Sequence, residues 1–68
     1  MTWHTHTHTE CTADLAGIRA RIRLYTDGFG AELHRGRELL AWAFEFPSEA
    51  AARDWCEGHA KVYAEAKR

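Results

Sequence analysis

The sequence contains no asparagine and no glutamine, a single proline and only two cysteines. Two cysteines, Cys11 and Cys56, are too few for the disulfide framework that stabilises small secreted domains. We expect both to be reduced, partly buried thiols, with a bridge between them as the alternative. The missing amide side chains, together with seven arginines against two lysines, are in keeping with proteins of GC-rich bacterial or phage genomes.

The chain also lacks an excess of charge of either sign and a long apolar run. The formal net charge is −1 at pH 7, so any attraction to nucleic acid or to a membrane must come from how the charges are distributed. The longest apolar run, LLAWAF at residues 39–44, is far too short to span a bilayer. Because no basic segment followed by an apolar one opens the sequence, we expect a cytoplasmic protein of a bacterial host cell, with no membrane partner.

What the chain does contain favours one small folded domain over residues 1–68. Hydrophobic residues make up 46% of the 68 residues and charged residues 28%. Three tryptophans, three phenylalanines and two tyrosines are enough aromatic side chains to build a core, which argues against disorder. A chain of this length has room for one core and no second module.

Alternation of polar and apolar residues predicts strands. The turn signals between them are Asp27-Gly28 in TDGFG, which is typical of a hairpin, and Gly36 in HRGR. The segment TADLAG is expected to connect the first strand to the second. The strands are predicted at residues 2–11, 18–25, 29–35 and 38–46.

A helix is predicted for residues 48–66. Pro47 ends the sheet because proline has no N–H to donate, and Ser48 is a suitable N-cap with Glu49 in the first turn. Acidic and basic residues recur every four positions on one side, which is typical of a solvated helix face. An apolar stripe that includes Trp55 and Val62 marks the other side.

These elements predict an α+β fold: an antiparallel meander of three to four strands, with one C-terminal helix packed on one face. The inward positions of the last strand and the helix then define the expected core. It consists of Trp42, Phe44, Phe46, Trp55 and Val62. The uncovered face of the sheet is the place to look for function.

Arginines occupy every second position of the second predicted strand. On an extended chain Arg19, Arg21 and Arg23 stand in one row, and their guanidinium groups are preorganised for carboxylate or phosphate. A solvated face with cross-strand Arg–Glu pairs is the alternative. The same face is expected to carry His4, His6, His8, Glu10, Tyr25, Glu32, His34 and Glu45.

The repeat HTHTH raises the question of a metal site. His6, His8 and Glu10 would form a two-histidine, one-carboxylate set if they shared a strand face. Cys11 points to the other face, which removes the obvious fourth ligand. We therefore expect solvent-exposed histidines, with no metal and no cofactor.

Catalytic groups are scarce. Cys56 and His59 lie three residues apart on the predicted helix and could touch, but no orienting carboxylate or oxyanion donor accompanies them. Packing residues are the simpler interpretation, so we do not expect an enzyme.

The stretch LLAWAFEFPSEAAARDW places a strand, a capped turn and an alanine-rich helix in succession. From residue 18 to 66 the order resembles the three-strand-plus-helix DNA-binding domains at the N-termini of phage-type integrases and the plant ethylene-response-factor domain. The resemblance implies that the open sheet face lies in the major groove. The chain departs from these families by its extra N-terminal strand, by glutamates on that face and by its slightly acidic charge. By position, the DNA contacts would be Arg19, Arg21, Arg23, Arg35 and Arg37.

In size and style the chain is also similar to small accessory inhibitors of phages and mobile elements, of which anti-CRISPR proteins are a group. Such proteins bind a nucleic-acid-handling complex directly and share no diagnostic motif. We therefore expect a non-enzymatic binding protein, monomeric or homodimeric, that docks its open sheet face on a host protein or ribonucleoprotein complex. DNA binding of the integrase type is the alternative. The expected contacts are Arg19, Arg21, Arg23, Tyr25, Glu32 and His34.

Overall fold

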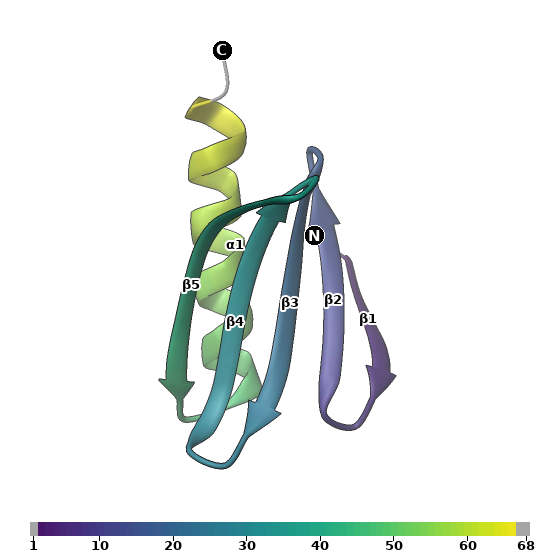
Figure 1. Cartoon of the computed structure of the whole chain (residues 1–68), viewed down its shortest axis with the longest axis vertical. Coiled ribbons are helices and arrows are strands. Elements are labelled where there is room, and N and C mark those ends of the chain that lie inside the picture. The colour runs from purple at the N-terminus through teal and green to yellow at the C-terminus, as the bar shows by residue number, and fades with distance from the viewer. Residues whose placement is uncertain (1, 67–68) are drawn as a thin grey trace.

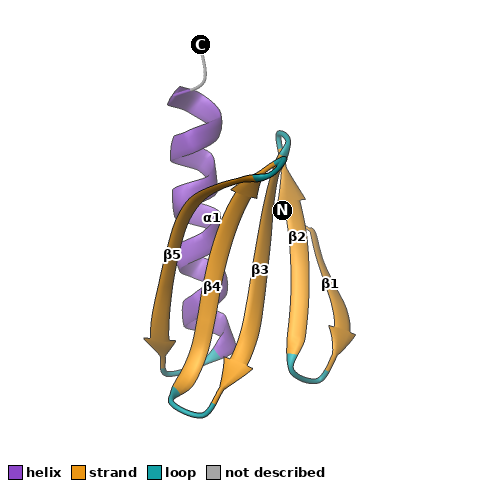
Figure 2. Cartoon of the chain, viewed as in Figure 1, coloured by secondary structure: helices purple, strands orange, loops and turns teal. Residues whose placement is uncertain are grey.

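The structure is a computed structural model that describes residues 2–66. It forms one five-stranded antiparallel sheet in the order β1-β2-β3-β4-β5, with a single helix against one face (Figures 1 and 2). The predicted α+β class, meander and C-terminal helix are therefore confirmed. The elements are β1 (Thr2–Thr7), β2 (Glu10–Leu15), β3 (Ile18–Tyr25), β4 (Gly28–Arg35), β5 (Glu38–Phe46) and α1 (Glu49–Ala66).

The sheet has five strands where the sequence predicted three to four, because the segment at residues 2–11 folds back on itself. The chain reverses between β1 and β2, where the Thr9 N–H donates to Thr7 Oγ1 at 3.1 Å. Strand β2 includes residues 12–15, which were predicted to lie in the connection between two strands. The next turn falls at Ala16 and Gly17, whose φ values of 51° and 82° suit a two-residue hairpin turn.

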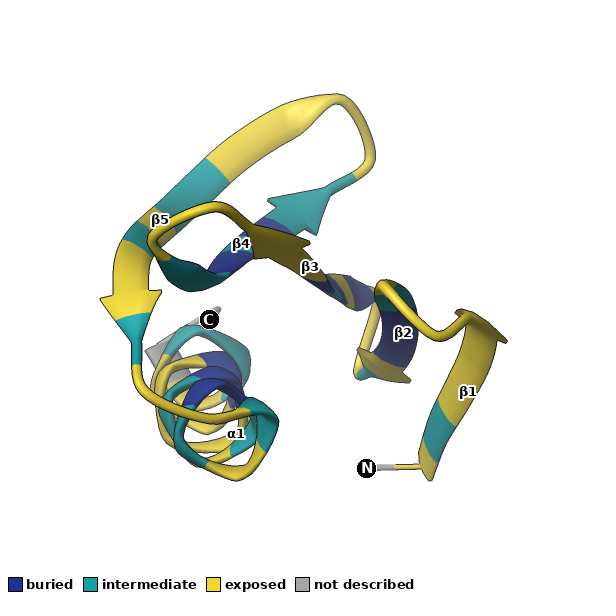
Figure 3. Ribbon diagram, turned by 90° about the horizontal axis from the view of Figure 1, so that it is seen from below, coloured by how far each residue is buried: buried dark blue, intermediate teal, exposed yellow. Residues whose placement is uncertain are grey.

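The core lies between α1 and the sheet, and Figure 3 shows the buried segments of both layers facing each other. Helix α1 contributes small side chains spaced four residues apart, Ala52, Cys56 and Ala60, each 0% exposed. Small residues on this stripe allow the helix backbone to approach the sheet closely. From the strands, the buried hydrophobic residues are Cys11, Ala13, Ile18, Ala20, Ile22, Ala31 and Leu33.

The predicted helix stripe is partly wrong. Val62 is 61% exposed, because the stripe through Ala52 and Ala60 faces the sheet instead. Trp55 does pack against the core at the edge of this stripe, with its ring centroid 5.9 Å from that of Phe46. The predicted N-cap is confirmed, since the Ala51 N–H donates to Ser48 Oγ at 3.1 Å.

Strand β5 departs from simple alternation at two places. Its pairing with β4 slips by one residue near each end, so β5 carries an extra residue at both. At the second slip Glu45 adopts a left-handed backbone conformation, with φ of 68°. Each slip reverses the face to which the following side chains point. Between the slips, Ala41 pairs with Leu33, Trp42 with Glu32 and Ala43 with Ala31.

These slips overturn two of the predicted core residues. Trp42 is 59% exposed and Phe44 is 48% exposed, both on the face of the sheet away from α1. Ala41 and Ala43 turn towards the helix instead, because they pair with the inward-facing Leu33 and Ala31. Phe46, beyond the second slip, packs against the core as expected.

Contacts between β1 and α1 fasten the N-terminal strand to the helix. The indole N–H of Trp3 donates to Glu57 Oε2 at 2.9 Å, and the Arg53 guanidinium lies 5.3 Å from the centre of the Trp3 ring. Arg53 is also paired with Glu49 one turn away. Within residues 2–66, no helix has the length and apolar character that a membrane crossing requires.

The slips of β5 place Trp42 on the open face, whereas Leu33 lies in the core. Substitutions at these two positions should therefore change the free energy of unfolding by unequal amounts. Leu33→Ala removes a side chain that is 0% exposed, and we expect it to lower the free energy of unfolding by about 2–5 kcal/mol. Trp42→Ala removes an exposed ring and should cost at most about 1.5 kcal/mol, the value of one aromatic pair. Urea denaturation measures both. A cost for Trp42→Ala equal to that of Leu33→Ala would contradict the register.

The left-handed backbone conformation of Glu45 predicts how two substitutions at this position change stability. Glycine adopts a φ of 68° without strain, so Glu45→Gly should be at least as stable as the parent. Glu45→Val places a β-branched side chain there and should lower the free energy of unfolding by about 1–3 kcal/mol. Thermal unfolding of the two variants provides the comparison, and a stability loss in the glycine variant would argue against the bulge.

Candidate functional site

The candidate site is the open face, defined as the side of the sheet opposite α1. Strand pairing and alternation decide which side chains lie there. The three arginines of β3 are on this face, as alternation predicts, and β2 places acidic residues directly beside them. Across β2 and β3, Asp14 pairs with Arg19, Thr12 with Arg21 and Glu10 with Arg23.

The arginine row is ion-paired along its whole length. The Nε atom of Arg19 lies 3.1 Å from Asp14 Oδ1. The Nε atoms of Arg21 and Arg23 lie 3.3 and 3.6 Å from the same oxygen, Glu10 Oε2. Such part-exposed pairs are worth about 0.2–1 kcal/mol each, so they can be exchanged for a partner's groups at little cost. Three guanidinium and two carboxylate groups leave the row with one net positive charge.

Glu32 and His34 occupy the open face of β4. The Nε2 atom of His34 lies 3.2 Å from Glu32 Oε1, so each of these side chains is engaged by the other. Strand pairing places Glu32 beside Arg21 and His34 beside Arg19. These predicted contact residues are therefore gathered with the arginine row in one polar region of the face.

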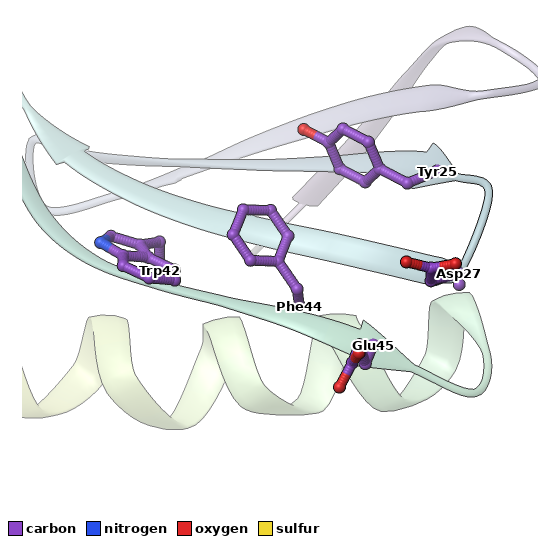
Figure 4. Close-up of a pocket in the computed structure, with 6 residues that line it drawn as sticks. Tyr25, Asp27, Trp42, Phe44 and Glu45 are labelled. Atoms are coloured by element: carbon purple, nitrogen blue, oxygen red, sulfur yellow. The ribbon is translucent and has the colours of Figure 1, made fainter.

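An exposed aromatic cluster, made of Tyr25, Trp42 and Phe44, lies next to this polar region. The Tyr25 and Phe44 rings meet edge to face, with centroids 5.6 Å apart and an interplanar angle of 84°. The Trp42 ring lies 5.2 Å from that of Phe44 at 46°. Figure 4 shows all three rings projecting from the same side of the sheet. Tyr25 is 43% exposed, so the cluster presents three large rings to solvent.

Gly30 forms the floor of the aromatic cluster. A Cβ atom at this position would lie 2.6 Å from both Tyr25 Cε2 and Phe44 Cδ1. The two rings therefore rest on bare backbone, and a side chain at residue 30 would displace them. Sequence reasoning missed Trp42 and Phe44 as surface residues. Gly30 inside a predicted strand was the available signal, since such glycines mark close approaches and bulges.

Two hollows lie at opposite ends of the open face. The first, of about 610 Å³, is lined by the aromatic cluster together with Asp27, Gly28 and Glu45. The second, of about 440 Å³, lies at the other end of β3. It is lined by Asp14, Gly17, Arg19, Arg21, His34 and Gly36. One hollow is thus aromatic and acidic, whereas the other is rich in cationic groups.

Other residues considered from the sequence are not on this face or not together. Arg35 lies on the side of α1, where its Nη2 donates to the Tyr63 carbonyl at 3.3 Å, and Arg37 is exposed in the turn after β4. His6 and Thr12 share a hydrogen bond of 2.7 Å between Nε2 and Oγ1. The reversal between β1 and β2 separates His6, His8 and Glu10. Across residues 2–66, no three His, Cys, Asp or Glu side chains are placed to hold a metal ion.

Cys11 and Cys56 are both free and buried. Burial raises the pKa of Cys56 to about 12, with smaller contributions from Cys11 and Glu57, and burial also raises the pKa of Cys11. His59 does not face Cys56: its Nδ1–H donates to the Trp55 carbonyl at 2.9 Å, and its ring stacks on Trp55 at 4.4 Å. These thiols are therefore held in the protonated, unreactive form.

Comparison of the chain with protein-family models, with curated proteins and with solved structures found no match. The residues of the open face therefore carry the functional inference.

The raised pKa of Cys56 predicts an alkaline loss of stability. Above the ordinary thiol pKa of 9.0 the unfolded chain loses a proton that the folded protein keeps until about 12. The free energy of unfolding should therefore fall as pH rises from about 9 to 12, by at most about 1.4 kcal/mol per pH unit from this group. Urea denaturation in reducing buffer at several pH values measures the slope. Cys56→Ala should show a shallower slope, and an unchanged one would refute the assignment.

Proposed function

We propose that the protein is a non-enzymatic binding protein that docks its open face on another protein. The observation that supports this most directly is the exposed aromatic cluster of Tyr25, Trp42 and Phe44. Contiguous exposed aromatic rings are enriched where proteins bind partners, and tryptophan and tyrosine are frequent among the residues that dominate binding energy. The fold itself does not need these rings in solvent, because its core lies on the other side of the sheet.

The polar region beside the cluster supports the same proposal. A typical interface has an apolar centre and a polar rim, and the open face has both side by side. Charges of both signs set register and exclude wrong partners, which suits Arg19, Arg21 and Arg23 with their acidic neighbours. We propose that these arginines, with Tyr25, Glu32 and His34, contact the partner. Trp42 and Phe44 join this set as its apolar anchors.

The class of partner rests on the sequence alone. A nucleic-acid-handling protein or ribonucleoprotein complex of a bacterial host, inhibited in the manner of anti-CRISPR proteins, stays a prediction from size and style. Binding to duplex DNA is the competing proposal. Its weakness is electrostatic, because each phosphate contact changes log K against log salt by a slope of about −0.9, and the paired row offers one net positive charge.

The test compares two exposed positions on opposite sides of the molecule. A protein recovered on the tagged chain from bacterial extract is purified, and its Kd is measured by calorimetry. Trp42→Ala should weaken binding by about 30-fold or more, as for a residue at the centre of an interface. Val62→Ala, on the outer face of α1, should leave the Kd unchanged. The triple alanine variant of the arginine row should also bind weakly while it unfolds at nearly the parent temperature.

Two outcomes would contradict the proposal. Equal losses in the Trp42 and Val62 variants would move the interface away from the open face. Tight binding of a 20-base-pair duplex in fluorescence anisotropy, lost steeply with added salt, would favour the DNA-binding alternative and end the protein-docking one.

A further inference from the structure

We propose that the aromatic hollow, formed by Tyr25, Trp42, Phe44, Asp27 and Glu45, receives an arginine side chain of the protein partner. This inference deepens the proposed function and rests on it for the source of the arginine. It assigns a chemical class to the group that the open face recognises, namely a planar organic cation.

The rings supply the first element of recognition. A guanidinium group is attracted to the face of a tryptophan, tyrosine or phenylalanine ring within about 6 Å of its centre. Trp42 is tilted by 46° to Phe44, which in turn stands at 84° to Tyr25, so the rings present surfaces in different directions around the hollow. The hollow is open and does not enclose its occupant. A flat cation that stacks on a ring suits this shape better than a compact ammonium group.

The charges supply the second element. Asp27 and Glu45 are the charged residues that line the hollow, and both are acidic. The ion pairs formed among residues 2–66 use neither of them, whereas the arginines of the neighbouring row are already engaged by Glu10 and Asp14. The hollow is therefore complementary to a positive charge. In Figure 4, Asp27 lies at the turn beside the rings, whereas the Glu45 carboxylate points away from them, so Asp27 is the carboxylate nearer to the rings.

The backbone holds this arrangement ready before any ligand arrives. The two slips of β5, the second of which is the bulge at Glu45, place Trp42 and Phe44 on the open face. The β3–β4 turn packs against that bulge, since a Cβ atom at Gly28 would lie 2.7 Å from the Phe46 carbonyl oxygen. Gly28 also has φ of 132°, which a residue with a side chain rarely adopts. The turn that carries Asp27 is thus fixed beside the rings, which reduces the cost of ordering the site on binding.

The test titrates the full, isotope-labelled chain with capped Gly-Arg-Gly and follows its NMR signals. The Trp42 indole N–H and the ring signals of Tyr25 and Phe44 should shift and saturate. Citrulline has nearly the shape of arginine without its charge, and capped Gly-citrulline-Gly should bind at least about threefold more weakly. Equal affinity for the two peptides would overturn recognition of a cation. Equal or tighter binding of capped Gly-Lys-Gly would overturn the assignment to a guanidinium group.

Matched variants locate the site. Asp27→Asn should weaken the arginine peptide by about threefold at low salt, and Asp54→Asn, the same exchange on the exposed face of α1, should leave it unchanged. Trp42→Leu should abolish the shifts of Tyr25 and Phe44. Equal effects of the two aspartate variants, or an unchanged response in Trp42→Leu, would place the cation elsewhere.

The inference and the proposed function can fail separately. If the arginine peptide binds as described but capture of the purified partner is insensitive to Trp42→Ala, the hollow stands and docking through the open face is wrong. If partner binding depends on Trp42 while arginine and citrulline peptides bind alike, docking stands and cation recognition is wrong.

Discussion

The structure depends on how closely α1 approaches the sheet. Its buried stripe consists of two alanines and a cysteine, so the space between the layers is narrow and is filled by isoleucine, leucine and alanine side chains from β3 and β4. Strand β5 carries an extra residue near each end, which turns Ala41 and Ala43 towards this core and sends Trp42 and Phe44 to the opposite face. The exposed aromatic cluster therefore lies on the face of the sheet opposite the core.

Local signals in the sequence were sufficient for most of the fold. Alternation placed β3, β4 and β5, and Pro47 with Ser48 placed the start of α1. The first hairpin was missed because His and Thr alternate without interruption through residues 4–9, and no glycine or proline marks the reversal there. The slips of β5 were missed for a different reason. A bulge is a property of two paired strands, so it depends on how β5 pairs with β4 and cannot be read from the residues of β5 alone.

The candidate site, like the fold, could be predicted from the sequence only in part. The alternation of side chains along β3 was enough to place Arg19, Arg21 and Arg23 on the open face. The structure adds that carboxylates of β2 form ion pairs with them. Those carboxylates reach the row because β2 is a strand of its own, which the sequence had read in part as a connection. Trp42 and Phe44 could not be assigned to this face without the register. Cross-strand pairs between arginines and acidic residues, the alternative considered from the sequence, are present, so the row is largely neutral and lies beside aromatic rings.

The double bulge of β5 ties the composition of the surface to the length of the chain. Because side-chain direction alternates with each residue, the same nine residues paired without a bulge from Glu38 onward would point Trp42 and Phe44 at the helix. Loss or gain of one residue between the two slips would reverse the faces of the residues that follow it, so that aromatic rings and methyl groups change places without any change of side-chain chemistry. Insertions and deletions in this strand are therefore a more abrupt route to altering recognition than point substitutions are.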